Sequence, residues 1–352
     1  MTILNIAYPL LQVGPASGGG AEQILHLLER GIAAAGHRSI VIAASASRLA
    51  GELLETPAFS GEMTEEIRAD AQRVHRARIE EALGRYAIDL IHFHGLDFHA
   101  YLPASRVPML ATLHLPLAWY PAGIFRPPNI ALNCVSHTQA ASAPAGIRPP
   151  VVCNGIDTAR YGAAPRSREF LLWLGRICPE KGVHIALDAA RRLDLPIIVA
   201  GPVHPFRAHE AYYTDCVQPL LDNKRRYAGP VDLAQKIGLL SRARCVLIPS
   251  LAPETSSLVA MEAAASGTPV VAFRAGALPE VVEHGVTGFI ADSIEEMTEY
   301  VKRSEDISPH ICRDRARARF GADRMRREYL ALYDRVITTL HLGTGSAPKA
   351  SL

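Results

Sequence analysis

The stretch of sequence that decides the fold is ARCVLIPSLAPETSSLVAMEAAASGTPVVAF, residues 243–273. Cys245–Ile248 and Val270–Phe273 are short apolar runs rich in β-branched residues, which are typical of buried strands. Between them, Leu258–Ala265 form a helical pattern that is apolar all round except at Glu262. A strand, a helix and a second strand in this order predict a parallel strand-helix-strand unit.

The same alternation of short apolar runs and helical patterns continues along the chain, so the predicted fold class is α/β. Continuous apolar strands are buried on both faces, which requires helices on each side of the sheets. Helices are expected after Pro179, Asp232 and Ser256. The predicted strands are residues 3–7, 39–43, 89–93, 109–113 and 131–135 in the first half, and 170–174, 197–200, 245–248 and 270–273 in the second.

A chain of 352 residues is too long for one hydrophobic core, so two domains are expected. Turn-forming residues interrupt the pattern at Asn154–Arg168 and predict a linker. The predicted organisation is an N-terminal Rossmann-like domain (1–163), a second Rossmann-like domain (164–321), a helix (about 322–340) that crosses back to the first domain, and a disordered tail (342–352).

The composition, 49% hydrophobic and 20% charged, is that of a globular protein, and no apolar run reaches the roughly 20 residues of a membrane span. Met1–Ala7 lacks the pattern of a secretory signal, so a cytoplasmic protein is expected. Six dispersed cysteines are typical of reduced thiols. A net charge of +2 argues against nucleic acid as a partner. The arginines of 73–85 indicate a solvated helix face, with peripheral membrane contact as the weaker interpretation.

A glycine-rich loop, Gly14–Gly20, follows the first predicted strand and opens the next helix. Such loops at the carboxyl ends of parallel strands bind ligands, and glycine lets a ligand approach the backbone closely. The spacing does not match the dinucleotide fingerprint, and Ala43, Ala44 and Ser45 stand where an acidic residue should hold a ribose. An oxidoreductase is therefore disfavoured.

The loop Leu174–Gly182 follows the first strand of the second half and has Pro179 at a favourable first position of a helix. It places Arg176 and Lys181 at the carboxyl end of that strand. A guanidinium and an ammonium beside a helix N-terminus suit a diphosphate, whose charge must be stabilised when it leaves. Two solvated surface cations are the alternative interpretation.

Glu262 is a single carboxylate inside an apolar helix, so it needs a partner, because an unpaired buried charge costs roughly several kcal/mol. The hydroxyls of a ribose would serve. Glu254 precedes the same helix, where it either offsets the helix dipole or accepts a hydrogen bond from a ligand hydroxyl. The NH groups of Ser256, Ser257 and Leu258 would form an anion cradle beside it.

With these residues, the chain resembles the family 4 retaining glycosyltransferases, which have the GT-B fold of two Rossmann-like domains with parallel sheets facing a central cleft. The resemblance covers nearly the whole chain, although many family members have phenylalanine and glycine in place of Ser256 and Ser257. It rests on two glutamates separated by seven residues (Glu254, Glu262), Gly175-Arg176 with Lys181-Gly182, Gly19-Gly20-Ala21-Glu22, Asn154-Gly155-Ile156-Asp157 and Gly276-Ala277-Leu278-Pro279-Glu280.

The resemblance implies a role for each matching residue. Arg176 and Lys181 would bind the diphosphate, Glu262 the ribose and Glu254 a hydroxyl of the transferred sugar. His114, after the predicted strand 109–113, would contact the donor sugar near the reacting centre. The expected catalytic residues are therefore His114, Glu254, Arg176 and Lys181. The remaining donor contacts are expected at Gly19 and Gly20 for the phosphates, at Gly201, Pro230 and Val231 for the base, and at Ser256, Ser257 and Leu258 for the cradle.

The implied reaction moves a hexose-type sugar from a nucleotide diphosphate donor to an acceptor hydroxyl with retention of configuration. UDP is the favoured nucleotide, with GDP or ADP as alternatives. Cationic side chains and helix NH groups replace a metal, so neither metal nor cofactor is expected. The acceptor, a saccharide, a lipid-linked group or a small metabolite, would bind the first domain through Ser45–Ile67 and His114–Pro128.

Other interpretations stay open at this point. A nucleotide-sugar epimerase can share the architecture and the donor, and would act without an acceptor. A catalytically silent sugar-nucleotide binding protein would bind the donor and transfer nothing. A metal site is a further alternative, because several potential ligands fall near strand ends: His92, His94, Asp97, His99 and His114. Histidines at strand ends, however, more often pack or contact substrate.

Overall fold

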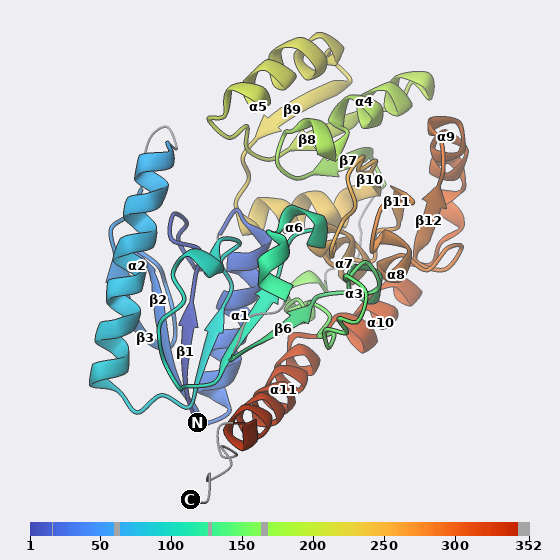
Figure 1. Ribbon diagram of the computed structural model, residues 1–352. Helices are drawn as coiled ribbons and strands as arrows, with labels where there is room; N and C mark the ends of the chain where they lie inside the picture. The colour runs from blue at the N-terminus through green and yellow to red at the C-terminus, as the bar shows by residue number, and fades with distance from the viewer. Residues whose placement is uncertain (16, 60–63, 126–128, 163–167, 344–352) are drawn as a thin grey trace, which may run out of the picture. The chain divides into compact units, whose positions relative to one another are not determined.

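The computed structural model describes residues 1–15, 17–59, 64–125, 129–162 and 168–343, and the chain forms two compact units (Figure 1). Unit 1 comprises Met1–Val135, Gln139–Cys153 and the C-terminal segment that begins at Ala322. Unit 2 comprises Ser136–Thr138 and Asn154–Gly321. Each unit contains one six-stranded sheet whose strand pairs are all parallel.

The sheet of unit 1 has the order β3-β2-β1-β4-β5-β6, which reverses direction between β1 and β4. Isoleucines 40 and 42 belong to one buried apolar cluster, and Val41 and Ala43 to another, so both faces of β2 are covered. The elements are β1 (Thr2–Ile6), α1 (Gly20–Ala34), β2 (Arg38–Ala44), β3 (Glu52–Thr56), α2 (Glu65–Arg85), β4 (Leu90–Phe93), β5 (Met109–Leu113), β6 (Ile130–Cys134), α3 (His137–Ala141) and α11 (Ala322–Gly343).

The sheet of unit 2 repeats this pattern as β12-β11-β10-β7-β8-β9, with the reversal between β7 and β10. Along β7, Leu171 and Trp173 face one apolar cluster, while Phe170, Leu172 and Leu174 face the other. The elements are β7 (Phe170–Leu174), α4 (Val183–Arg192), β8 (Ile197–Ala200), α5 (Arg207–Tyr212), β9 (Arg225–Gly229), α6 (Leu233–Arg242), β10 (Ala243–Ile248), α7 (Leu258–Ala265), β11 (Val270–Phe273), α8 (Leu278–Val281), β12 (Gly288–Ala291), α9 (Ile294–Arg303) and α10 (Pro309–Phe320).

Helix α11 packs on unit 1 through polar as well as apolar contacts. The Tyr329 hydroxyl lies 3.1 Å from Thr112 Oγ1 on β5, and the Tyr333 hydroxyl lies 2.8 Å from His92 Nδ1 on β4. On α1, a Cβ at Gly31 would crowd the side chain of Arg326, so glycine permits the close approach of α1 and α11 seen in Figure 1. The helix extends to Gly343, and the rest of the predicted tail lies outside the described residues.

The predicted linker folds largely with unit 2. Ile156 donates from its backbone NH to Phe320 O at 2.7 Å, and Tyr161 is buried in the unit 2 core. The main segment of unit 2 begins at Asn154, nine residues before the predicted end of the first domain at 163. Residues 163–167 lie outside the described part of the chain.

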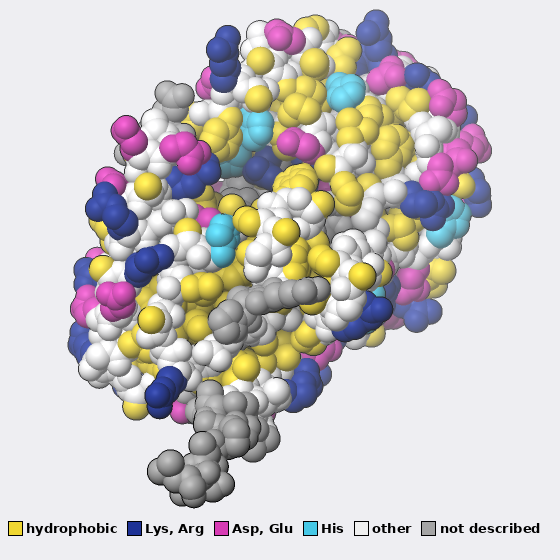
Figure 2. Space-filling model, viewed as in Figure 1, with side chains coloured by type: hydrophobic (Ala, Val, Ile, Leu, Met, Phe, Trp, Pro, Cys, Tyr) yellow, Lys and Arg dark blue, Asp and Glu magenta, His cyan; other side chains and the backbone are white. Residues whose placement is uncertain are grey.

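Charges of both signs are interspersed over the face shown in Figure 2. On α2, most arginines of the expected solvated face are exposed, and two of them, Arg73 and Arg78, pair with carboxylates one turn away, Asp70 and Glu81. Among the described residues, no helix is both long and apolar enough to cross a membrane.

Candidate functional site

The strand order locates the site of unit 2. In open parallel sheets, ligands bind at the carboxyl ends of the strands where the strand order reverses. In unit 2 this point lies between β7 and β10, which pair directly with each other. The loop after β7 carries Arg176 and Lys181, and the loop after β10 carries Glu254, so the topology brings two sequence-predicted loops to one point.

The helix after β7 begins later than the sequence predicted. Pro179–Lys181 form a single 3-10 turn, and α4 begins only at Val183. Gly182 separates the two with a φ of 64°, and a Cβ there would collide with Pro249 O, so no other residue fits this position. Lys181 therefore lies before the helix, where the Trp173 indole holds its carbonyl through a hydrogen bond of 3.3 Å.

The Lys181 ammonium and the Glu254 carboxylate form the centre of the candidate site. Lys181 Nζ lies 2.6 Å from Glu254 Oε1, and the side chains are 30% and 10% exposed. Ser250 Oγ donates to the same carboxylate oxygen at 2.5 Å. Glu254 is thus held as a hydrogen-bond acceptor in a partly desolvated position, beside a cation that still reaches solvent.

The backbone of Glu254 is fixed by the loop that follows β11. Glu254 and Gly276 form a parallel bridge, and Ala277 N donates to Glu254 O at 2.7 Å. Gly276 has a φ of 57°, and a Cβ there would overlap the backbone of Glu254. The Gly276-Ala277-Leu278-Pro279-Glu280 motif therefore positions the Glu254 loop.

Helix α7 begins where the sequence places it. Ser257 is its N-cap and accepts a hydrogen bond from Ala260 N at 3.4 Å. The hydroxyl oxygen of Ser256 is buried and has no hydrogen-bond partner among the residues that the structure describes. Because buried hydroxyls are normally hydrogen-bonded, this oxygen beside Glu254 suits a polar ligand.

Glu262 has protein partners that sequence reasoning missed. Its side chain is 3% exposed, and its Oε1 accepts from Lys236 Nζ at 2.5 Å and from the Tyr161 hydroxyl at 2.8 Å. Lys236 comes from α6, and Tyr161 from the segment after Asn154-Gly155-Ile156-Asp157. The prediction that Glu262 requires a partner is confirmed, but an ion pair and a tyrosine supply it. The sequence feature that could have indicated this partner is the basic residue Lys236, one turn after the capping residue Asp232.

The remaining predicted residues of unit 2 lie at the ends of strands. Gly201 follows β8 with a φ of 142°, and its NH donates to Gly229 O at 2.8 Å. A Cβ there would collide with the Gly175 carbonyl, so the position requires glycine. Val231 is half-buried just before α6. Arg176 is exposed on the loop after β7.

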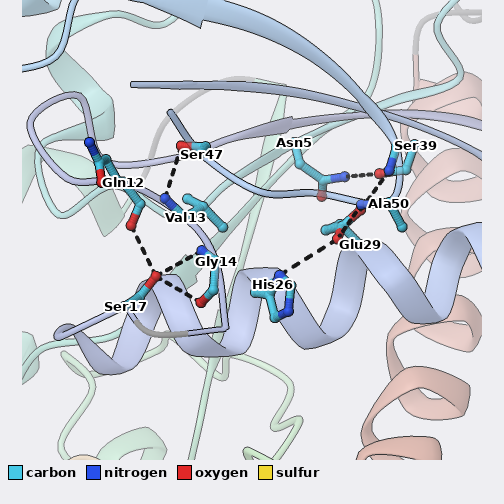
Figure 3. Close-up of polar contacts among 11 residues, drawn as sticks. Asn5, Gln12, Val13, Gly14, Ser17, His26, Glu29, Ser39, Ser47 and Ala50 are labelled. Atoms are coloured by element: carbon cyan, nitrogen blue, oxygen red, sulfur yellow. Dashed lines mark hydrogen bonds and ion pairs between the residues drawn. The ribbon is translucent and has the colours of Figure 1, made fainter. Parts of the chain in front are cut away.

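In unit 1, side-chain hydrogen bonds shape the glycine-rich loop after β1 (Figure 3). Ser17 Oγ accepts from Gly14 N at 2.8 Å and lies within 3.0 Å of the carbonyl oxygens of Gln12 and Gly14. Gly19 is the N-cap of α1, where a Cβ would collide with the Glu22 carboxylate, and Gly20 is its first residue. A larger residue at Gly19 would therefore require the Glu22 carboxylate to move.

His114 follows β5, is half-buried and contacts the buried His94. Its Nε2 lies 3.3 Å from Nδ1 of His94, which follows β4. Burial lowers the pKa of His114 to about 4, because the charged ring is disfavoured away from water. The pKa of His94 is also lowered, by burial and then by its histidine neighbours. Both rings are therefore neutral near pH 7.

The metal interpretation of the β4 and β5 histidines fails at His92. Its Nδ1 contacts the Tyr333 hydroxyl at 2.8 Å, and its Nε2 contacts Thr112 Oγ1 at 2.7 Å, so both nitrogens are occupied. Asp97 accepts from Gln72 and Tyr101. These side chains dock α2 and α11 on the sheet, which is the packing role expected of most histidines at strand ends.

Comparisons with known proteins match both halves of the chain. Residues 18–160 match the family model described as "Glycosyltransferase Family 4", and residues 168–304 match "Glycosyl transferases group 1". The chain belongs to glycosyltransferase family 4. It is 28% identical over 355 residues to a glycogen synthase of Mycobacterium tuberculosis, an alignment that covers 82% of this chain and 81% of the relative.

Solved structures of glycosyltransferases share the fold. A glycosyltransferase involved in avilamycin A biosynthesis superimposes with a TM-score of 0.75 at 22% identity, over 96% of this chain and 99% of the other. HepE of Anabaena in complex with UDP-glucose gives 0.73 at 19% identity, over 95% and 100%. The two Rossmann-like units are therefore those of a GT-B glycosyltransferase.

Proposed function

We propose that this glycosyltransferase is a retaining enzyme that moves a hexose-type sugar from a nucleotide diphosphate sugar to an acceptor hydroxyl without a metal ion. The observation that carries the proposal is the Lys181–Glu254 pair at the strand-order reversal of unit 2. One partner can stabilise an anionic leaving group and the other can accept from a sugar hydroxyl.

The proposed binding mode assigns each group of unit 2 to one part of the donor. Lys181 and Arg176 take the diphosphate, and the NH groups at the start of α7 add to the positive potential there. Glu254 accepts from a hydroxyl of the sugar, and the Ser256 hydroxyl gains a partner. Glu262 accepts from the ribose while Lys236 and Tyr161 keep its carboxylate in place.

In the proposed reaction, the bond between the anomeric carbon and the diphosphate oxygen breaks first, giving an oxocarbenium-like transition state. The leaving diphosphate takes the proton of the acceptor hydroxyl, and the new bond forms on the same face of the sugar. Lys181 and Arg176 stabilise the charge that develops on the diphosphate, which is the contribution that a metal makes in other transferases. His114 contacts the donor sugar as a neutral ring.

UDP is the favoured nucleotide because HepE of Anabaena, which shares the fold, is solved with UDP-glucose. Thermal-shift titrations with UDP, GDP, ADP, their sugar conjugates and NAD, with and without EDTA, test this choice. A nucleotide diphosphate at a hundred times its Kd should stabilise the fold by about 2.7 kcal/mol in the presence of EDTA. Stabilisation by NAD alone, or only with added metal, contradicts the proposal.

The catalytic assignment is tested with Lys181→Ala and Glu254→Gln, measured by slow hydrolysis of the donor sugar. Each should lower kcat by about 10²–10³-fold, because each removes a charge at the reacting centre. Lys224→Ala is the matched control, since Lys224 also pairs with a carboxylate at 2.6 Å but is exposed. Early NMR spectra of the released sugar should show the anomer of the donor. Near-native turnover in either variant, or release of the opposite anomer, contradicts the assignment.

A further inference from the structure

Three potential metal ligands of different chemistry converge in unit 2 outside the Lys181–Glu254 pair. They are the thiol of Cys178, the carboxylate of Glu180 and one ring nitrogen of His209, and their ligand atoms all lie within 4.8 Å of one another. Cys178 and Glu180 belong to the loop after β7, and His209 belongs to α5, which follows β8.

The separations fit a tetrahedral ion after a small adjustment. Zinc binds sulfur at about 2.3 Å and nitrogen or oxygen at about 2.0–2.2 Å, so ligand atoms around it lie about 3.3–3.6 Å apart. Side chains whose ligand atoms already lie within 4.8 Å reach this spacing by rotations that move each atom by about 1 Å.

His209 lacks the contacts that would explain its orientation. Its Nδ1 is buried and has no hydrogen-bond partner within the described part of the chain. The ring packs edge-on against Phe206, with centroids 5.1 Å apart. Buried imidazole nitrogens usually have partners, and an ion between His209 and Cys178 would supply one.

Access also favours a cation at this cluster. Cys178 is buried, whereas Glu180 is exposed and His209 is half-buried, so an ion can enter from the side of these two residues. A coordinating thiol loses its proton to solvent, so Cys178 would bind the ion as a thiolate.

We propose that Cys178, Glu180 and His209 form a binding site for a thiophilic divalent cation, Zn²⁺ in chemistry, with water in the fourth position. On binding, the S–H bond of Cys178 breaks, its proton passes to solvent and the sulfur electron pair bonds to the metal, with no change of oxidation state. The ion would fasten the loop after β7 to α5. It is a structural tie beside Arg176 and takes no part in the proposed transfer.

Cobalt(II) titration of the full chain, reduced with a phosphine, tests the site directly. A tetrahedral cobalt-thiolate site gives a charge-transfer band in the near ultraviolet and visible d–d bands, and added Zn²⁺ should remove both. Cys178→Ser should abolish the charge-transfer band, and His209→Gln should weaken binding by at least about tenfold. Circular dichroism shows whether each variant is folded, and His209→Gln keeps the test decisive if Cys178→Ser is not.

Matched controls separate this site from other thiols, imidazoles and the donor site. Cys216→Ser removes an exposed free thiol, and His310→Gln removes an exposed imidazole paired with Asp314, so both should keep the cobalt spectrum. Lys181→Ala should also keep it, so failure of the proposed transferase chemistry and failure of the metal site are distinguishable. The absence of a thiolate band in the unsubstituted chain, or its persistence in Cys178→Ser, overturns the proposal.

Discussion

Replacing Lys236 by methionine tests how Glu262 is kept inside unit 2. The substitution preserves the length and most of the volume of the side chain, but it leaves the carboxylate without its cation. Glu262 is 3% exposed and Lys236 is 18% exposed, so solvent cannot compensate for the loss. Removing one partner of such a buried pair costs about 3–5 kcal/mol. Tyr161 still donates to the carboxylate at 2.8 Å, which places the expected loss near the lower limit, about 3 kcal/mol.

The measurement is urea unfolding followed by tryptophan fluorescence. The chain has two tryptophans, and Trp173 lies in the core of unit 2 whereas Trp119 is exposed in unit 1. A Trp119→Phe background therefore makes the signal specific to unit 2. Lys224→Met, which breaks an exposed pair with Asp194, should cost less than about 1 kcal/mol.

A second substitution identifies the cause of the loss. In Lys236→Met combined with Glu262→Gln, the buried group is neutral and can still accept from Tyr161, so most of the lost stability should return. A loss below about 1 kcal/mol in Lys236→Met refutes the reasoning that the carboxylate depends on its cation. So does a double variant that is no more stable than the single one.

Two further predictions follow from backbone geometry and from buried histidine. Gly276→Ala should weaken nucleotide-sugar binding and lower Tm more than Gly285→Ala does. Both glycines have positive φ, but only a Cβ at Gly276 would collide with the backbone of Glu254. Equal losses of Tm in calorimetry would mean that the left-handed backbone alone causes the effect. Burial lowers the pKa of His75 from 6.5 to about 4. Below pH 6.5, His75 is therefore protonated in the unfolded chain while it stays neutral in the folded chain until the pH approaches 4. Stability should therefore fall as the pH decreases, by about 2 kcal/mol at pH 5 from this residue. Urea titrations at pH 7.5 and 5 should show a smaller difference in His75→Gln.

The central strands could be predicted because burial on both faces leaves a strong signal. β10 and β11 are nearly continuous apolar runs, and the expected bounds agree with the structure to within two residues. Of the three missed strands, β3 and β9 lack that signal, whereas β12 reads GFIA and is buried but has only four residues. β9 reads RRYAG and is only half-buried at a sheet edge, and β3 reads ELLET at the edge of the other sheet. β3 also lies within Ser45–Ile67, which was expected to bind the acceptor.

Side-chain partners could be predicted in kind but not in identity. The apolar surroundings of Glu262 were enough to show that its carboxylate needs a donor. The actual donors, Lys236 and Tyr161, are 26 and 101 residues away in sequence, and only the packing of α6 and of the segment after Asn154 brings them near. His92 shows the same limit, because its partner Tyr333 is 241 residues away.

The position of the candidate site follows from topology more than from any single motif. Both sheets have the same order of strands, and in each the reversal joins the first strand of the unit to its fourth. A loop from each of these strands therefore opens at one point of the sheet edge, where helix N-termini also point. In unit 2 one loop supplies Lys181 and the other Glu254, 73 residues apart in sequence and 2.6 Å apart in space. The proposed transfer would therefore use a cation and a carboxylate that the fold already holds together.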